Sequence, residues 1–459
     1  MSAAAPKAES LQTRATPAGS PSANAASSSR PILLGCIADD MTGATDLANN
    51  LVRAGMRVIQ TIGVPEHPLA TDTDAVVVAL KSRTLPADEA IAQSLAALRW
   101  LQAQGAKQIY FKYCSTFDST AQGNIGPVTE ALMDALADMP GSDFTIATPA
   151  FPDNHRTVFK GHLFVGDVLL NESGMQNHPL TPMRDANLVR VLQAQCRRKV
   201  GLIDYQVVAR GEAAIGQHIE QLRAQGVGLA VVDALSNDDL MRLGRALKDM
   251  PLITAGSGVA IGLPANFGLT PSSTASALPK ATGLQAVISG SCSLATNRQV
   301  QAFIQTGRPA LEINPLQIIA QESAGQDVVA DALAWATPLL VHGPVLIYSS
   351  ADAAAVTTVQ NQLGVHAAGA MVERTLAAIA RGLVERGVCQ LVVAGGETSG
   401  ACVHALGITQ MQIGSQIDPG VPWCHAQTQV APQHGLHLSL KSGNFGTDDF
   451  FTKAFTALA

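Results

Sequence analysis

Two adjacent carboxylates, Asp39 and Asp40, follow an apolar run at residues 32–38. Thr42 comes next, and an amphipathic helix is predicted over residues 44–53. Carboxylates accept protons or ligand hydroxyls, whereas the free N–H groups and positive dipole end of a helix start hold an anion. The stretch therefore predicts a site for a ligand with hydroxyls and negative charge, with Asp39 and Asp40 as catalytic residues. Adjacent strand residues point to opposite faces, so we expect one carboxylate to orient the helix start and the other to face the ligand. The alternative is a solvated turn that only caps the helix.

Cationic and hydroxyl side chains follow other predicted strands. Lys112 sits at the end of an apolar strand, predicted over residues 108–114, where an unpaired ammonium is costly, so it needs an anion from Asp118, Asp39 or a ligand carboxylate. Arg156 can pair with a carboxylate or phosphate as a planar fork. The structural alternatives are a salt bridge that only shapes the Lys112 loop and an exposed hairpin tip at Arg156. The predicted substrate-binding residues are Thr42, Lys81, Arg83, Lys112, Ser115, Thr116, Asp118, His155 and Arg156.

Glycine- and hydroxyl-rich turns follow three predicted strands of the C-terminal half, at residues 289–293, 395–400 and 442–446. Glycine lets the backbone approach a ligand closely, and a helix start presents free N–H groups. One such turn often serves geometry alone, but three together predict a cradle for nucleotide phosphates. Neither GxxxxGK[ST] nor a strand–helix turn with GxGxxG is present. The predicted nucleotide-binding residues are Ser291, Ser293, Gly395, Gly396, Glu397, Thr398, Gly443 and Asn444.

Strands and helices alternate along the chain from residue 31, which predicts an α/β fold with mainly parallel sheets covered on both faces. In such sheets ligands bind beyond the carboxyl ends of the strands, where the polar clusters fall. We expect two α/β domains, at residues 31–265 and 284–459, with the active site in the cleft between them. Residues 266–283 lack periodicity and are predicted to be a linker. Residues 1–30 are rich in Ala, Ser, Pro and Thr, and are predicted to be a disordered tail.

Composition excludes several classes of protein. A chain of 459 residues is too long for one ordinary core. The net charge of −6, without basic blocks, argues against nucleic-acid binding. The sequence contains no run of 18 apolar residues, so no membrane span is predicted. Seven cysteines without CxxC spacing indicate reduced core residues of a cytoplasmic protein. His434 and His437 have HxxH spacing, but a strand would face them apart, and no acidic ligand is near; no protein-built metal site is predicted.

Four motifs resemble the four-carbon acid sugar kinase family: IADDMTGATD at 37–46, YCSTFDST at 113–120, GGETSG at 395–400 and SGNFG at 442–446. Their order and spacing make the resemblance specific, and it runs from about residue 31 to the C-terminus. Within the family, residues 110–127 look most like the 3-oxo-tetronate kinases. The resemblance implies an N-terminal sugar-acid-binding domain, a C-terminal nucleotide-binding domain, and ATP-dependent phosphorylation of a C4 hydroxyl.

The residues agree with what this resemblance implies. Lys112 and Arg156 would hold the carboxylate of a sugar acid, Asp39 or Asp40 would accept or orient the proton of the attacking hydroxyl, and the three turns would hold ATP. Mg²⁺ would bridge the phosphates, with Glu397 as one candidate ligand, or else a residue that binds the ribose. The expected partners are a small sugar acid and ATP, with a homodimer possible, and no nucleic acid or membrane.

Other functions remain open from the sequence. Threonate and erythronate kinases are close relatives of the preferred subfamily. A non-enzymatic two-domain sugar-acid sensor would need an output module, and no helix-turn-helix pattern is present. A dehydrogenase is disfavoured because the dinucleotide fingerprint is missing.

Overall fold

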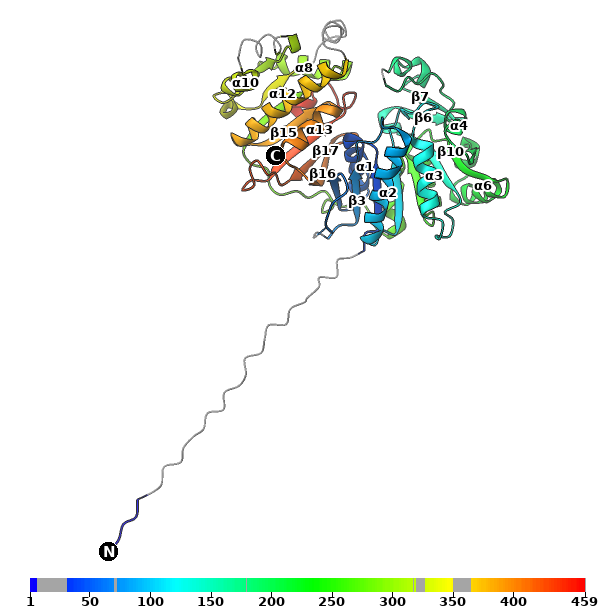
Figure 1. The fold of residues 1–459 in the computed structure, drawn as a ribbon, viewed down its shortest axis with the longest axis horizontal. Helices are drawn as coiled ribbons and strands as arrows, with labels where there is room; N and C mark the ends of the chain where they lie inside the picture. Colours follow the sequence, from blue (N-terminus) through cyan, green and yellow to red (C-terminus); the bar gives the residue numbers. More distant parts are fainter. Residues whose placement is uncertain are drawn as a thin grey trace.

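The computed structural model of the chain describes residues 1–5, 31–69, 72–178, 180–316, 318, 327–349 and 365–458. Most of the predicted N-terminal tail lies outside these residues. The described chain forms two α/β lobes side by side, with the N-terminal half in one and the C-terminal half in the other (Figure 1). Within the described residues, no helix is both long enough and apolar enough to cross a membrane.

The N-terminal lobe is built on eight parallel strands whose side chains are mostly buried. Helices cover both faces, so the strands read as continuous apolar runs, as β1 and β3 do. In spatial order the strands are β2 (Val58–Ile62), β3 (Ala75–Ala79), β1 (Leu34–Ala38), β4 (Gln108–Lys112), β11 (Leu252–Ala255), β5 (Thr145–Thr148), β10 (Val227–Val232) and β9 (Lys199–Ile203). The helices are α1 (Met41–Arg53), α2 (Ala87–Ala103), α3 (Ile125–Ala135), α4 (Leu188–Gln193), α5 (Tyr205–Val208), α6 (Glu212–Ala224) and α7 (Asn237–Ala246).

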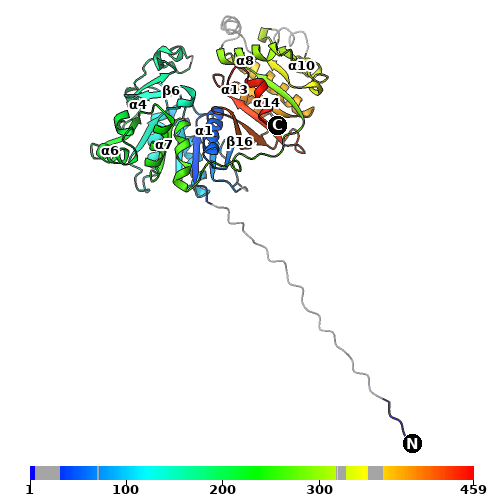
Figure 2. The same ribbon diagram turned by 180° about the vertical axis from the view of Figure 1, so that it is seen from behind.

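A small antiparallel sheet stands apart from this lobe's main sheet. It consists of β6 (Arg156–Phe159), β7 (His162–Val165) and β8 (Val168–Leu169). Figures 1 and 2 show it above the carboxyl ends of the lobe's strands, on the side that faces the other lobe. We call residues 151–178 the flap. It brings side chains over the site from a direction that the main sheet cannot supply.

The C-terminal lobe has five parallel strands: β13 (Ala310–Glu312), β14 (Val345–Tyr348), β12 (Leu284–Ser289), β15 (Val388–Ala394) and β18 (Leu436–Lys441). Its helices are α8 (Leu294–Gln305), α10 (Val328–Ala336), α12 (Val365–Glu385), α13 (Gly396–Ala405) and α14 (Phe450–Thr456). Both lobes are therefore α/β with mainly parallel sheets, which confirms the predicted fold class.

The two sheets join through a hairpin that the sequence patterns did not predict. Strands β16 (Gln410–Asp418) and β17 (Val421–Ala426) pair antiparallel, and β17 also pairs with β18. Strand β16 then pairs antiparallel with β2 of the other lobe, where Met411 lies opposite Gln60. One sheet of 15 strands thus runs through both lobes. The segment 268–283, described throughout, crosses between the lobes without helix or strand; the exact domain limits stay a prediction.

Helix α1 lies at the junction of the lobes (Figures 1 and 2). It contacts β1, β2 and β3 of its own lobe and β16, β17 and α13 of the other. Residues 42–52 are consequently all buried, although a helix against one sheet would bury only one face. The first turn of α1 therefore sits where residues of both lobes can reach it.

Candidate functional site

Arg83 holds the two predicted catalytic carboxylates together at the carboxyl end of β1. Its Nε and Nη2 atoms donate to the two oxygens of Asp39 at 2.8 and 2.9 Å, and Nη2 also donates to Asp40 Oδ1 at 2.5 Å. Burial raises the pKa of Asp39, and the attraction of Arg83 opposes this rise. Asp39 is 4% exposed. Both of its oxygens are thus engaged in a buried bidentate pair.

Asp40 is the N-cap of α1 and has partners on both oxygens. Oδ1 accepts from the Gly43 N–H at 3.0 Å and lies 3.5 Å from Lys112 Nζ, while Oδ2 accepts from the Thr42 hydroxyl at 2.9 Å. Burial works to raise the pKa of Asp40, but Arg83, Lys112 and these hydrogen bonds outweigh it and lower the pKa to about 2. A Cβ atom on Gly43 would lie 1.8 Å from Lys112 Nζ, so only glycine admits the lysine here.

A cavity of about 410 Å³ opens beside Asp40, with walls from both lobes and from the flap. Of the residues predicted from the sequence it gathers Asp40, Thr42, Arg83, Lys112, Ser115, Thr116, Asp118, Arg156 and Asn444. The remaining lining residues are Gly43, Asp46, Cys114, Val165, Ser173, Met175, His178, Ser442 and Phe445. The cavity is strongly polar and carries both signs of charge.

Arg156 enters this cavity from the first strand of the flap. Among the described carboxylates none lies in ion-pair range of its guanidinium, and its Nε atom is buried without a hydrogen-bond partner. Burial lowers the pKa of Arg156. The guanidinium donates to the backbone oxygen of Asn154 and lies over the Phe445 ring at 6.0 Å from the centroid. A partly buried guanidinium without an ion-pair partner is suited to a ligand anion. Neighbouring His155 sits in an exposed left-handed turn (φ 57°) and does not line the cavity.

The three glycine-rich turns of the C-terminal lobe converge. A Cβ atom on Gly443 would lie 2.6 Å from Ser291 Oγ, and one on Gly395 would lie 2.9 Å from Thr398 Oγ1. The Ser293 hydroxyl donates to the Gly443 carbonyl at 2.5 Å and also caps α8. These close approaches require glycine and leave backbone N–H groups at two helix starts. The arrangement fits the phosphates of a nucleotide. We call residues 289–293, 395–400 and 442–446 the phosphate-type turns.

One of the phosphate-type turns comes close to the start of α1 across the lobe junction. A Cβ atom on Gly396, the first residue of α13, would lie 3.8 Å from Thr42 Oγ1 at the start of α1. Lys81 and Glu397, which were predicted to bind substrate and nucleotide respectively, form an ion pair at 2.8 Å on the exposed rim. Two helix starts, one from each lobe, therefore open toward the same space.

Lys441 is a residue of the site that sequence reasoning missed. It is fully buried at the end of β18, and its ammonium donates to Thr296 Oγ1 and to the carbonyls of Ser442, Gly443 and Phe445 at 3.0 to 3.2 Å. Burial lowers its pKa to about 7. Its available signal was a lysine at the end of an apolar strand, directly before a glycine-rich turn. Lys441 holds the turn 442–446 in place and puts a positive charge beneath it.

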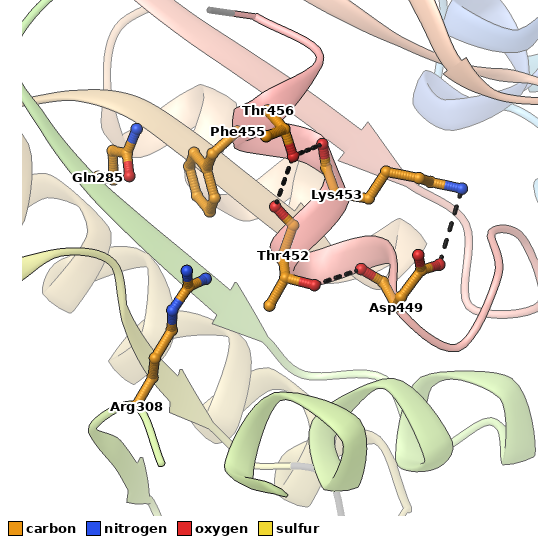
Figure 3. A pocket seen from close by; sticks show the side chains of 7 residues that line it. All are labelled: Gln285, Arg308, Asp449, Thr452, Lys453, Phe455 and Thr456. Atoms are coloured by element: carbon orange, nitrogen blue, oxygen red, sulfur yellow. Dashed lines mark hydrogen bonds and ion pairs between the residues drawn. The ribbon is translucent and has the colours of Figure 1, made fainter. Parts of the chain in front are cut away.

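A larger hollow, of about 520 Å³, lies elsewhere on the C-terminal lobe (Figure 3). It is formed by α14, the start of β12 and Arg308, and it contains none of the predicted site residues. Gln285 is the second residue of β12, whereas the turn 289–293 follows the end of that strand, so the hollow lies toward the opposite sheet edge. Figure 3 shows Asp449 directed toward Lys453 rather than toward Arg308. We therefore place the candidate site in the cavity between the lobes.

In the parts of the chain that the structure describes, no group of three or more His, Cys, Asp and Glu side chains is arranged to hold a metal ion. The Nε2 atom of His437, the second histidine of the HxxH pair, donates a hydrogen bond to the Pro279 carbonyl at 2.9 Å. A Mg²⁺ ion carried on nucleotide phosphates needs only one or two protein carboxylates and is compatible with this arrangement.

Fold and site together define a two-domain α/β protein with a polar cavity between its lobes. Residues 34–263 match the family described as "Sugar-binding N-terminal domain" and residues 286–451 match "Nucleotide-binding C-terminal domain". The chain belongs to this family of two-domain kinases, which confirms the resemblance found in its motifs.

Individual relatives cover almost the whole chain. A Burkholderia multivorans protein named 3-oxo-tetronate kinase is 59% identical over 437 residues, 94% of this chain and 99% of the relative. A Pseudomonas fluorescens protein of the same name is 58% identical over 94% of this chain and 98% of its own. The crystal structure of Haemophilus influenzae protein HI1011 superimposes with a TM-score of 0.74 at 44% identity, over 93% of this chain and all of that one.

Proposed function

We propose that this protein is an ATP-dependent kinase that phosphorylates the C4 hydroxyl of 3-oxo-tetronate. The observation that carries the proposal is the cavity in which Lys112 and the unpaired Arg156 meet Ser442 and Asn444 of the other lobe. A four-carbon sugar acid supplies the missing anion, and its far end then points to the phosphate-type turns. The relatives named 3-oxo-tetronate kinase support this substrate over threonate or erythronate.

The acceptor side is formed by the N-terminal lobe. Arg156 and Lys112 hold the carboxylate of the sugar acid, while Ser115, Thr116 and Asp118 bind its oxygens. Asp39 fixes Arg83, and Asp40 fixes both Arg83 and Lys112 against the start of α1. Positioning of this kind matters in phosphoryl transfer, because the protein mainly orients the two substrates and offsets developing charge.

The nucleotide side is formed by the turns of the C-terminal lobe. Ser291, Ser293, Gly395, Thr398 and Gly443 surround the phosphates, and Lys441 supports them from below. Mg²⁺ would offset the charge of the phosphates, and Glu397 is the residue that would hold it. Closure of the lobes completes the site and excludes water from it.

A coupled assay of ADP release tests the proposal directly. The purified protein is mixed with ATP, Mg²⁺ and a panel of 3-oxo-tetronates, threonates and erythronates. We expect the highest kcat/KM with a 3-oxo-tetronate. Turnover only with threonate or erythronate would reassign the substrate, and binding without any turnover would favour a sensor instead of a kinase. Size-exclusion chromatography with light scattering tests the further expectation of a homodimer.

A further inference from the structure

Asp46 is a buried acid of the cavity that has one oxygen free. It lies on α1 one turn after Thr42, is 4% exposed and lines the cavity. The Ser257 hydroxyl donates to Oδ2 at 2.5 Å, whereas Oδ1 has no hydrogen-bond partner among the described residues. A buried polar atom without a partner is rare in a native protein, and because Asp46 is one of the residues that line the cavity, a group of the ligand is a suitable partner for this oxygen.

The other carboxylates near α1 lack such a free oxygen. Both oxygens of Asp39 accept from Arg83, and those of Asp40 accept from Gly43, Arg83 and Thr42. A group that takes a proton from a hydroxyl must come within hydrogen-bond reach of it. Asp39 and Asp40 are therefore better arranged to fix cations than to approach a ligand hydroxyl.

Resting on the proposed kinase function, we propose that Asp46 is the proton acceptor for the C4 hydroxyl. The C4 oxygen forms a bond to the γ-phosphorus of ATP, while the bond from that phosphorus to the β–γ bridging oxygen breaks. ADP leaves with that electron pair. The hydroxyl proton passes to Asp46 Oδ1 and goes to water after the product leaves.

The surroundings of Asp46 suit this role. The charged groups that face it are Lys112 from β4, Asp40 from the start of α1 and Arg156 from β6; the buried phenol of Tyr110 is the remaining titratable neighbour. From the C-terminal lobe, the β16–β17 turn contributes only backbone, since a Cβ atom on Gly420 would lie 2.6 Å from Oδ1. Burial raises the pKa of Asp46 to about 6, and Lys112 and Ser257 limit the rise. A general base with a pKa just below neutrality is ionised yet basic at neutral pH.

Asp46→Asn tests the proposal, because the amide keeps the shape and loses the basic oxygen. We expect kcat to fall by about 100-fold or more, while the Kd values for ATP and sugar acid, measured by calorimetry, change by less than about threefold. The acidic limb of the wild-type pH–rate profile, rising with pH through about 6, should vanish in the residual activity of the variant. Asp143→Asn, on an exposed carboxylate paired with Arg223, is the matched control and should keep wild-type kinetics.

Ser257→Ala provides an independent readout that keeps the carboxylate. Loss of the donated hydrogen bond should move the acidic limb to higher pH without abolishing turnover. The proposal is overturned if Asp46→Asn keeps kcat within about threefold of wild type, or if the acidic limb stays in place in Ser257→Ala. Should Asp46→Asn fail to fold, Ser257→Ala alone decides. Absence of turnover in the wild-type protein with every C4 acid would instead reject the proposed function.

Discussion

The Nζ atom of Lys81 lies 2.8 Å from Oε2 of Glu397, and the two residues belong to opposite lobes. Lys81 follows β3 of the N-terminal lobe, and Glu397 stands in the first turn of α13. Both side chains are largely exposed, at 85% and 66%. Water and salt therefore screen the pair, so that it contributes only about 0–1 kcal/mol to stability.

Lys81→Ala should accordingly lower the free energy of unfolding, measured in urea, by less than about 1 kcal/mol. Glu397→Lys places two ammonium groups at the rim and should raise the KM for ATP. The double variant Lys81→Glu with Glu397→Lys reverses the ion pair and should bring the KM for ATP part of the way back to the wild-type value. A loss of stability well above this limit in Lys81→Ala would show that the pair is not screened.

Asp40→Asn should lower kcat by about 100-fold while leaving the Kd for ATP nearly unchanged. The substitution removes the charge that Arg83 and Lys112 both face, so the acceptor side loses its geometry while the phosphate-type turns are untouched. Steady-state kinetics and calorimetry with ATP separate the two effects. Collapse of the ATP affinity would mean that the two lobes have been assigned the wrong ligands.

Arg156→Lys should raise the KM for the sugar acid by about 10- to 100-fold, because an ammonium cannot reproduce a bidentate guanidinium pair with a carboxylate. The KM for ATP should stay unchanged. Arg190→Lys serves as the control, since Arg190 is exposed and paired with Asp185 on the N-terminal lobe. An equal rise in both KM values for Arg156→Lys would place the guanidinium on the nucleotide instead.

Lys441→Met should change the pH dependence of stability. The unfolded chain keeps the Lys441 proton until about pH 10.5, whereas the folded protein releases it near pH 7. The unfolded state thus binds more protons between these two pH values, so the free energy of unfolding of the wild type rises with pH over this range. Below pH 7 the lysine is charged in both states, and the full cost of burying the charge lowers the stability of the folded protein. Between pH 6.5 and 9 the rise is about 2.5 kcal/mol.

In the methionine variant this rise should disappear from urea unfolding curves recorded at the two pH values. The KM for ATP should also increase, because the turn 442–446 loses the donor that fixes three of its carbonyls. A rise in stability of unchanged size in Lys441→Met would assign the titration to another group.

Local patterns predicted those parts of the protein that depend on neighbours in sequence. The buried strand before Asp39, the helix that follows Asp40 and the turn at Gly395 each follow from residue types a few positions apart. The predicted start of that helix at residue 44 was three residues late, because Asp40 caps the helix and its first residue is Met41. The fold class and the family followed from these motifs.

Contacts between distant segments were not predictable in the same way. Strands β16 and β17 contain Gly414 and Pro422, which weaken a strand pattern, and β16 is fixed by pairing with β2, more than 300 residues earlier. The partners of Lys441 are mostly backbone carbonyls, which every residue carries, so no side-chain motif reveals them. The room around the unpartnered oxygen of Asp46 depends on Gly420 of the other lobe, because a Cβ atom there would lie 2.6 Å from it.

The antiparallel pairing of β16 with β2 also limits how the protein can be divided. Strand β16 of the C-terminal lobe accepts and donates backbone hydrogen bonds at the outer edge of β2, and β2 does the same for β16. A gene cut within residues 268–283 would leave β2 as an unpaired outer strand on one fragment and β16 on the other. Such strands recruit further chains. Separately expressed halves should therefore aggregate, whereas co-expressed halves should reassemble into an active complex.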